Sequence, residues 1–145
     1  MSPLQLSLAC DGYDRTNALR TGSIRPDGID LNYLCLPVEE TFHRMVKYRE
    51  FDAAELSLSS YLLTLESDDP PFVAIPVYPS RSFRHSGIYV NNNAGITKPE
   101  DLIGKVVGLP EYQVTAAVWI RGILAEHHGV PVDSVKYRTG GIHAP

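Results

Sequence analysis

The chain has 145 residues, of which 43% are hydrophobic and 21% charged, the size and composition of an ordinary soluble domain. Seventeen acidic and thirteen basic residues leave a formal net charge of -4, which disfavours a nucleic-acid-binding surface. No apolar run reaches the roughly 18 to 20 residues of a membrane span, and the first residues pass directly into a strand pattern rather than a secretory leader. We therefore expect a cytoplasmic protein that binds neither nucleic acid nor membrane.

Strands and helices alternate along the predicted structure. Alternating or largely apolar runs predict strands at residues 4–10, 29–36, 51–58, 72–78, 86–90, 105–109 and 134–138. Helical spacing and capping residues predict helices at residues 18–22, after Pro37, and at 59–65, 99–102 and 115–128, the last closed by Gly129. This order indicates an α/β fold with a mainly parallel sheet.

The two cysteines, Cys10 and Cys35, follow neither a C-x-x-C pattern nor metal-ligand spacing. Because both fall in predicted strands of a protein expected in a reducing compartment, we expect two buried thiols.

Candidate binding residues follow the predicted strands, because ligands of open α/β sheets collect at the carboxyl ends of the strands. The polar residues of the four loops at these ends are Asp11, Tyr13, Asp14 and Arg15; Ser59, Ser60 and Tyr61; Arg81, Arg84 and His85; and Glu111, Tyr112, Gln113 and Thr115. Three arginines, one histidine and two helix N-termini would suit a ligand with more than one carboxylate.

Each of these signals also has a plainer interpretation. Arg81 and Arg84 fit solvated loop charges, and His85 fits a surface residue. Asp11 is a common turn-former or helix cap, and Glu111 fits a capping acid before a helix. The sequence carries no phosphate-loop, dinucleotide, zinc-protease or nucleophile-elbow motif. With no cluster of metal-ligand spacing either, we predict neither a metal nor a cofactor.

Several motifs carry a resemblance to a known family. The run from Ile96 to Gly108 follows the pattern I-x-x-P-x-D-L-x-G-K-x-V-G and resembles the entry to the second lobe of type II periplasmic-binding-protein folds. Four further stretches resemble the 4,5-dihydroxyphthalate decarboxylase family within that superfamily: residues 9–15, 80–86, 108–122 and 135–141.

The resemblance implies a two-lobed α/β fold with helices on both faces of mostly parallel sheets. Residues 1–92 would form the first lobe, and residues 93–145 the hinge crossing and the start of a second lobe. Family members are about twice this long, as two joined domains would be. The resemblance therefore implies a partial chain with an incomplete second lobe, and it leaves the activity of this chain open.

The implied activity is that of a carboxy-lyase converting 4,5-dihydroxyphthalate to protocatechuate and CO2. In that setting Arg81 and Arg84 would hold carboxylates, assisted by the helix N-termini at Ser59 and Thr115. The proton donor would be His85 or Glu111. Arg15 or Tyr112 would contact the ring hydroxyls. Asp11 and Tyr13 would complete the residues that bind the substrate.

A second hypothesis is a non-catalytic solute-binding protein that delivers an aromatic or other carboxylate to an ABC-type transporter. Such a protein would need a secretory or lipoprotein leader, so the direct start of the first strand favours the enzyme. On either hypothesis the partner is a small carboxylate, and a homo-oligomer remains open.

Overall fold

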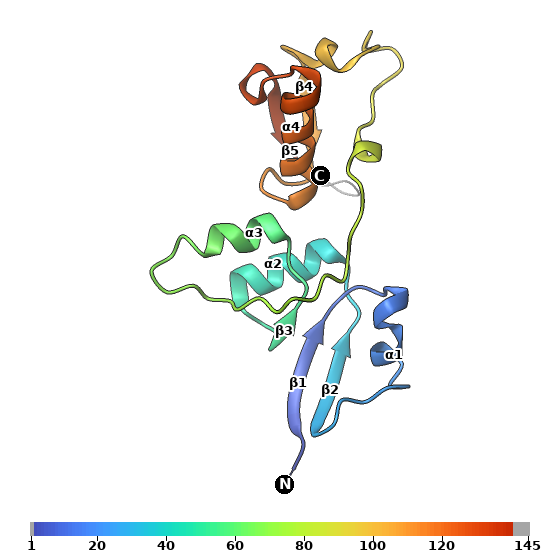
Figure 1. Ribbon diagram of the computed structural model, residues 1–145, viewed down its shortest axis with the longest axis vertical. Coiled ribbons are helices and arrows are strands. Elements are labelled where there is room, and N and C mark those ends of the chain that lie inside the picture. Colours follow the sequence, from blue (N-terminus) through green and yellow to red (C-terminus); the bar gives the residue numbers. More distant parts are fainter. Residues whose placement is uncertain (1, 141–145) are drawn as a thin grey trace. The chain divides into compact units, whose positions relative to one another are not determined.

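The computed structural model describes residues 2–140 (Figure 1). Their contacts divide them into two units. Unit 1 comprises the residues up to Ser57 together with Ser67–Arg81, and unit 2 comprises Leu58–Glu66 with the residues from Ser82 onward. The predicted boundary after residue 92 stays a prediction.

Unit 1 is built on a parallel three-stranded sheet in the order β2-β1-β3 (Figure 1). Its strands are β1 (Leu4–Ala9), β2 (Ile29–Leu34) and β3 (Ala53–Ala54). In the register of the sheet, Ala9 lies beside Leu34 on one side and Ala54 on the other. The three carboxyl ends therefore meet at one edge, where Cys10 and Glu55 follow directly.

Two helices accompany this sheet. α1 (Asn17–Arg20) follows a 3-10 turn at Asp14–Thr16, and α2 (Val38–Tyr48) confirms the amphipathic helix predicted after Pro37. Arg44 of α2 binds the Glu40 carboxylate at 2.6 Å and lies over the Phe51 ring at 4.9 Å. The contact with Phe51, together with a 2.8 Å hydrogen bond from Arg44 Nε to the Glu50 carboxylate, ties α2 to the segment that enters β3.

Unit 2 contains a parallel pair of strands, β4 (Val106–Leu109) and β5 (Lys136–Thr139). α4 (Thr115–His128) connects them, as parallel pairing requires a crossover, and α3 (Leu58–Thr64) belongs to the same unit. The core consists of Leu102, Leu124, Val130 and Val135. The remaining elements are 3-10 turns at His85–Gly87, Pro99–Leu102 and Val132–Ser134.

α4 has the bounds predicted from the sequence. Its predicted cap is also confirmed, since Gly129 has a φ of 62° and its N–H bonds the Leu124 carbonyl. Glycine takes this left-handed conformation without the steric cost that a Cβ would bring.

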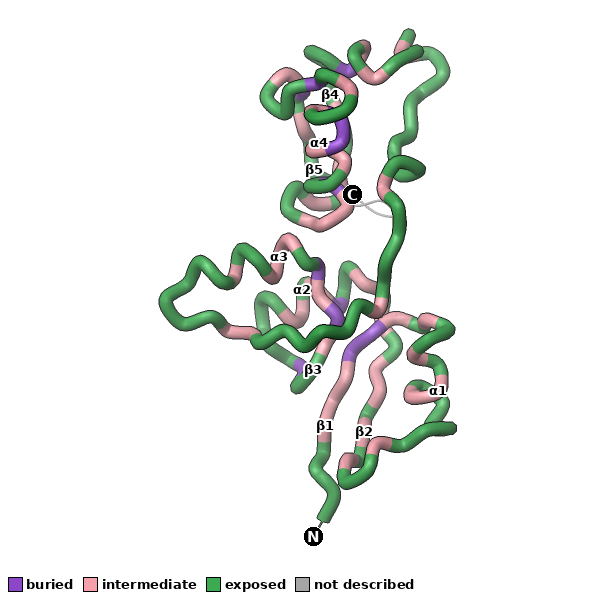
Figure 2. The backbone as a smooth tube through the Cα atoms, viewed as in Figure 1, coloured by how far each residue is buried: buried purple, intermediate pink, exposed green. Residues whose placement is uncertain are grey.

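The strands predicted at residues 72–78 and 86–90 are wrong. This part of the chain is extended but unpaired, and its second half contains the 3-10 turn at 85–87. Figure 2 shows the stretch as almost continuously exposed, and Val73, Phe83 and Tyr89 are 92%, 90% and 89% exposed. A strand requires a paired neighbour for its backbone N–H and C=O groups, and neither sheet of the described residues includes this stretch.

Two further expectations need correction. The strand predicted at 51–58 is reduced to the two residues of β3, because only Ala53 and Ala54 lie in register with β1. Cys10 is buried as expected, whereas Cys35 is exposed, because β2 ends one residue before it.

The coarse fold class is confirmed: both sheets are parallel and helices alternate with strands. Within residues 2–140, no helix is long and apolar enough to cross a membrane.

Candidate functional site

The loop after β1 is fixed by the carboxylate of Glu55, which follows β3. Glu55 Oε1 accepts the backbone N–H of Asp11 at 2.6 Å, and Oε2 accepts the hydroxyl of Tyr13 at 2.8 Å. The Glu55 N–H in turn donates to the Ala9 carbonyl at 3.0 Å. Two predicted site residues, Asp11 and Tyr13, are therefore positioned by a residue that sequence reasoning did not select.

Glu55 is only 8% exposed, and none of the salt bridges among the described residues includes it. An ionised carboxylate is costly to bury unless hydrogen bonds replace its water. Here the peptide N–H of Asp11 and the phenol of Tyr13 supply them. The site in unit 1 therefore holds a buried acid paired with neutral donors.

Burial raises the pKa of the Tyr13 phenol, and the neighbouring Glu55 carboxylate raises it further, against an opposing effect of the Ser80 side chain. Tyr33 donates to the carbonyl of Asp11 at 2.9 Å, and burial raises its pKa to about 12. Burial also raises the pKa of the Cys10 thiol. The groups around Glu55 are therefore held in their neutral, proton-bearing forms.

Arg15 contributes a positive charge beside this cluster. Its guanidinium lies 5.0 Å from the centroid of the Tyr13 ring and binds Asp14 at 2.9 Å. Its Nε donates to the Pro79 carbonyl, which brings the loop carrying Arg81 to the same part of unit 1. Arg81 is exposed and lies 6.0 Å from the Tyr78 ring centroid.

In unit 2 the starts of α3 and α4 lie together. The Ser59 N–H donates to Thr115 Oγ1 at 3.2 Å, and the Ser59 hydroxyl donates to the Gln113 carbonyl. The N-termini of the two helices predicted to begin at Ser59 and Thr115 are therefore hydrogen-bonded to each other within unit 2.

Arg121 is a buried base in the middle of α4, 8% exposed. Its guanidinium carbon lies 3.7 Å from the Tyr112 ring centroid and 5.7 Å from that of Tyr137. Arg121 Nη1 donates to the Tyr112 carbonyl at 2.8 Å. The loop after β4, which carries Tyr112, is thus anchored to α4 through a cation against aromatic rings.

The predicted catalytic residues have few contacts. His85 is exposed at the start of the 85–87 turn, and Arg84 immediately before it is half-buried. Glu111 is half-buried and accepts the side chain of Gln113 at 3.0 Å. Among the hydrogen bonds of the described residues, none joins His85 to Glu111, and their catalytic roles stay predictions.

Two functional candidates, Glu55 and Arg121, were not predicted from the sequence. The signal for Glu55 was a second acid, besides Asp52, inside the strand predicted at residues 51–58. The signal for Arg121 was a base at helical spacing with the buried residues Ala117 and Leu124. In both cases the signal was a charged residue within an element that was predicted from its apolar residues.

A surface groove of unit 1 lies away from these residues. A groove of about 440 Å³ in unit 1 runs between α1 and β2 and includes Leu19, Ile24 and Tyr33. Its lining contains none of the predicted site residues, so we place no site there. Within residues 2–140, no three His, Cys, Asp or Glu side chains are grouped so as to hold a metal ion.

Parallel strands whose carboxyl ends carry an acid, tyrosines and arginines are typical of α/β proteins that bind small polar ligands. No protein-family model matches the chain. The chain is 44% identical, over all of its 145 residues, to a 4,5-dihydroxyphthalate decarboxylase of Comamonas testosteroni, of which it covers 44%. It is 43% identical over 141 residues to a 4,5-dihydroxyphthalate decarboxylase of Pseudomonas putida, of which it covers 55%.

The chain is therefore similar along its whole length to part of each of these two 4,5-dihydroxyphthalate decarboxylases, which confirms the resemblance carried by its motifs. It spans about half the length of these curated relatives. One of those motifs ends at Gly141, which lies outside the described residues.

Proposed function

We propose that the protein acts as a carboxy-lyase that converts 4,5-dihydroxyphthalate to protocatechuate and CO2. The observation that carries this proposal is the identity of 43–44% to two proteins named for that activity, over 97–100% of the chain. Neither relative is named as a solute-binding protein, so the transporter hypothesis gains no support.

The reaction replaces a carboxylate on the ring by hydrogen. A proton is added to the ring carbon that bears the carboxylate, the bond to the carboxylate breaks, and its electron pair stays with the ring as CO2 leaves. An ionised ring hydroxyl assists, because it supplies electron density to the carbon that takes the proton. The protein must therefore hold two carboxylates, deliver a proton and help to ionise a hydroxyl.

The predicted residues divide among these tasks. Arg81 and Arg84 hold the carboxylates, because guanidinium groups match carboxylates with two parallel hydrogen bonds. His85 or Glu111 donates the proton. Arg15 or Tyr112 contacts the ring hydroxyls, and Asp11, Tyr13, Ser59 and Thr115 complete the binding residues. The hydrogen bond from Tyr13 to Glu55 supports the presence of a polar binding loop after β1.

The finer description of the fold is also part of this proposal. We assign the chain to the type II periplasmic-binding-protein fold, with a first lobe at residues 1–92 and the beginning of a second at 93–145. The parallel sheets support this assignment. We further propose a cytoplasmic location, a small aromatic dicarboxylate as the partner, and chemistry that needs no metal.

The activity is tested with two proteins: the 145-residue chain and a chimaera in which residues 1–145 replace the matching part of the Comamonas testosteroni decarboxylase. Each is incubated with 4,5-dihydroxyphthalate, and CO2 and product are measured before and after chelation. We expect CO2 from the chimaera, unchanged by chelation. A folded chimaera that releases none would contradict the proposed function, and activity restored only by a divalent ion would contradict the metal-free chemistry.

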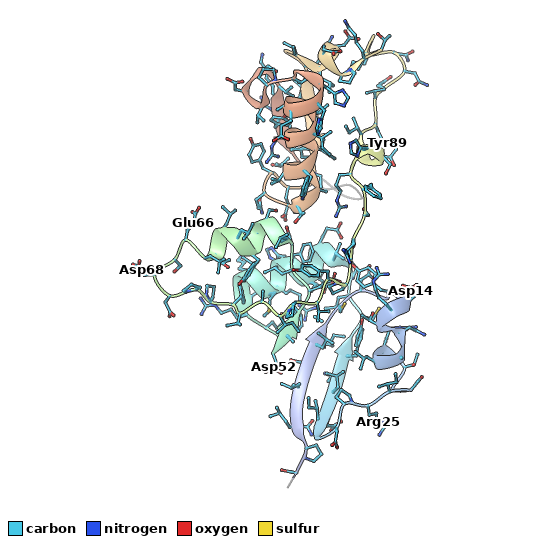
Figure 3. All side chains as sticks on the ribbon, in the orientation of Figure 1. Asp14, Arg25, Asp52, Glu66, Asp68 and Tyr89 are labelled. Carbon is cyan, nitrogen blue, oxygen red and sulfur yellow. The ribbon has the colours of Figure 1, made fainter. Side chains whose placement is uncertain are left out.

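The carboxylate-binding role is tested by Arg81→Ala and Arg84→Ala in the chimaera, or in the 145-residue chain if that chain is itself active. We expect each variant to lose at least about 30-fold in kcat/KM, since removing one partner of a buried, hydrogen-bonded charge pair costs about 2 to 5 kcal/mol. Arg25→Ala, which removes an exposed arginine of the loop before β2 (labelled in Figure 3), is the charge-matched control. Equal kinetics for all three variants would remove this assignment.

A further inference from the structure

We propose that Glu55 is the acceptor of a proton relay that runs from a ring hydroxyl of the bound substrate through the hydroxyl of Tyr13. This inference rests on the proposed function, since it assigns a role within that reaction to a carboxylate that the sequence left unassigned.

The direction of the hydrogen bond between Tyr13 and Glu55 sets what Tyr13 offers to a ligand. The Tyr13 hydroxyl donates its one proton to Glu55 Oε2 at 2.8 Å, which leaves only its lone pairs for a further partner. A ligand group bound there must therefore be a donor. A phenolic hydroxyl fits this requirement, whereas a substrate carboxylate would bring an acceptor, and a negative charge, towards Glu55.

Glu55 is placed to receive a proton rather than to form an ion pair. It is 8% exposed, and within the described residues no Arg, Lys or His forms a salt bridge with it. Its second oxygen is held by the Asp11 N–H at 2.6 Å, so the carboxylate cannot rotate away without losing a buried bond. The acceptor is thus held in one orientation by a hydrogen bond to each of its oxygens.

The titratable and charged groups facing this pair come from three segments. Cys10 and Asp11 follow β1, Arg15 lies over the Tyr13 ring at 5.0 Å, and Tyr33 comes from β2. Burial together with the Glu55 carboxylate raises the pKa of Tyr13, which keeps the phenol protonated and able to pass on a proton. The Arg15 charge favours an anion formed on a ligand beside Tyr13.

The relay balances as two coupled proton transfers. The O–H bond of the substrate hydroxyl breaks as its proton binds the Tyr13 oxygen, and the Tyr13 O–H bond breaks as that proton binds Glu55. The products are a substrate phenolate, a neutral Tyr13 and a neutral Glu55 carboxylic acid. The phenolate then supplies the electron density that assists protonation of the ring and loss of CO2, after which the proton returns along the same path.

The first experiment detects the phenolate itself. Protocatechuate is titrated into the protein, and the ultraviolet difference spectrum is recorded for the long-wavelength absorption of an ionised catechol. Variants Glu55→Gln and Tyr13→Phe are compared with the protein itself and with Asp52→Asn. Asp52 is a matched control because it precedes β3 as Glu55 follows it, and its carboxylate binds Ser7 instead, at 2.7 Å. Figure 3 labels Asp52 beside β3.

We expect an ionised-catechol band with the unaltered protein and with Asp52→Asn, and its loss in Glu55→Gln and Tyr13→Phe. Circular dichroism checks the fold of each variant. If Glu55→Gln does not fold, Tyr13→Phe decides, since that change leaves the bond from Asp11 to Glu55 in place. A band that persists in a folded variant, or no band with the unaltered protein, would overturn the relay.

The second experiment measures turnover in the active protein. We expect Glu55→Gln and Tyr13→Phe each to lower kcat about 100-fold, the lower end of what proton-transfer groups contribute, with a much smaller change in KM. The double variant should be no slower than either single variant, because both changes interrupt one relay. Additive losses would contradict it. If the unaltered protein shows no turnover, the proposed function is contradicted. The relay is then tested by the difference spectrum alone.

Discussion

Among the described residues, unit 1 buries one acidic side chain beside a tyrosine and unit 2 buries one basic side chain beside two tyrosines. In unit 1 the carboxylate of Glu55 is 8% exposed and accepts bonds from Asp11 and Tyr13. In unit 2 the guanidinium of Arg121 is equally buried and lies against Tyr112 and Tyr137. Among the described residues neither forms a salt bridge.

The difference lies in how each charge is held. Glu55 is bound edge-on by two hydrogen-bond donors, one of which, Tyr13, is itself half-exposed and open to a ligand. Arg121 is covered face-on by the Tyr112 ring and donates a hydrogen bond to the backbone carbonyl of Tyr112. The acid therefore remains chemically accessible through its tyrosine, whereas the base mainly anchors a loop. Glu55 and Arg121 are therefore buried to the same extent but have different roles.

The largest expected effect comes from removing the buried base. Arg121→Ala should destabilise unit 2 by about 3 kcal/mol, because it leaves a cavity, loses the contact with the aromatic rings and frees the Tyr112 carbonyl. Urea unfolding followed by the fluorescence of Trp119, the single tryptophan and a residue of α4, measures the loss.

The control for that change is Arg138→Ala, which removes an exposed arginine of β5 and should cost less than about 0.5 kcal/mol. The loss of stability in Arg121→Lys should lie between those of the two alanine variants. A lysine keeps the positive charge, but its ammonium group is not planar and cannot stack on the aromatic ring. Equal stabilities for Arg121→Ala and Arg138→Ala would show that Arg121 anchors nothing.

Removal of the buried acid should cost less, about 2 kcal/mol for Glu55→Ala. The Asp11 N–H and the Tyr13 hydroxyl lose their acceptor, but the loop can move to let water reach them. Hydrogen exchange of the β1 amides reports this loss in unit 1. Asp68→Ala, in the exposed loop after α3 (labelled in Figure 3), should leave the exchange unchanged, and equal protection in both variants would contradict the role of Glu55.

The smallest effect concerns Tyr33, which holds the same loop from β2 through the Asp11 carbonyl. Tyr33→Phe should cost about 1 kcal/mol at neutral pH, one hydrogen bond. Because its pKa is raised from 10 to about 12, the phenol's contribution is complete below pH 10 and is lost as pH rises to 12. Between these values the unaltered protein should therefore lose stability more steeply than Tyr33→Phe. If the free energy of unfolding falls equally with pH in both proteins, the role of the Tyr33 phenol is contradicted.

Local patterns sufficed for the elements that carry their own signals. α4 combined apolar spacing with a glycine that can take a positive φ, and α2 combined an amphipathic pattern with acids in its first turn. Both lie where the pattern places them. The alternating run of β1 likewise predicted a strand, and the alternation of strands with helices predicted parallel sheets.

The same reasoning failed where pairing decided the outcome. Residues 72–78 and 86–90 have the apolar composition of strands, yet neither run joins a sheet of the described residues, and Val73 and Tyr89 are exposed. β3 stops after Ala54 because its register with β1 stops there. That early stop puts Glu55 at the carboxyl end of the sheet rather than inside a strand.

By itself the sequence determined the α/β class, the main helices with the cap at Gly129, and the kinship with the decarboxylases, since these depend on short-range patterns and motifs. Only the tertiary structure decided which apolar runs became strands and which charges were buried. Pairing and burial depend on residues far apart in the chain: the carboxylate of Glu55 meets the hydroxyl of Tyr13 across 42 positions. No local pattern records that contact, because it exists only where the carboxyl ends of β1 and β3 come together.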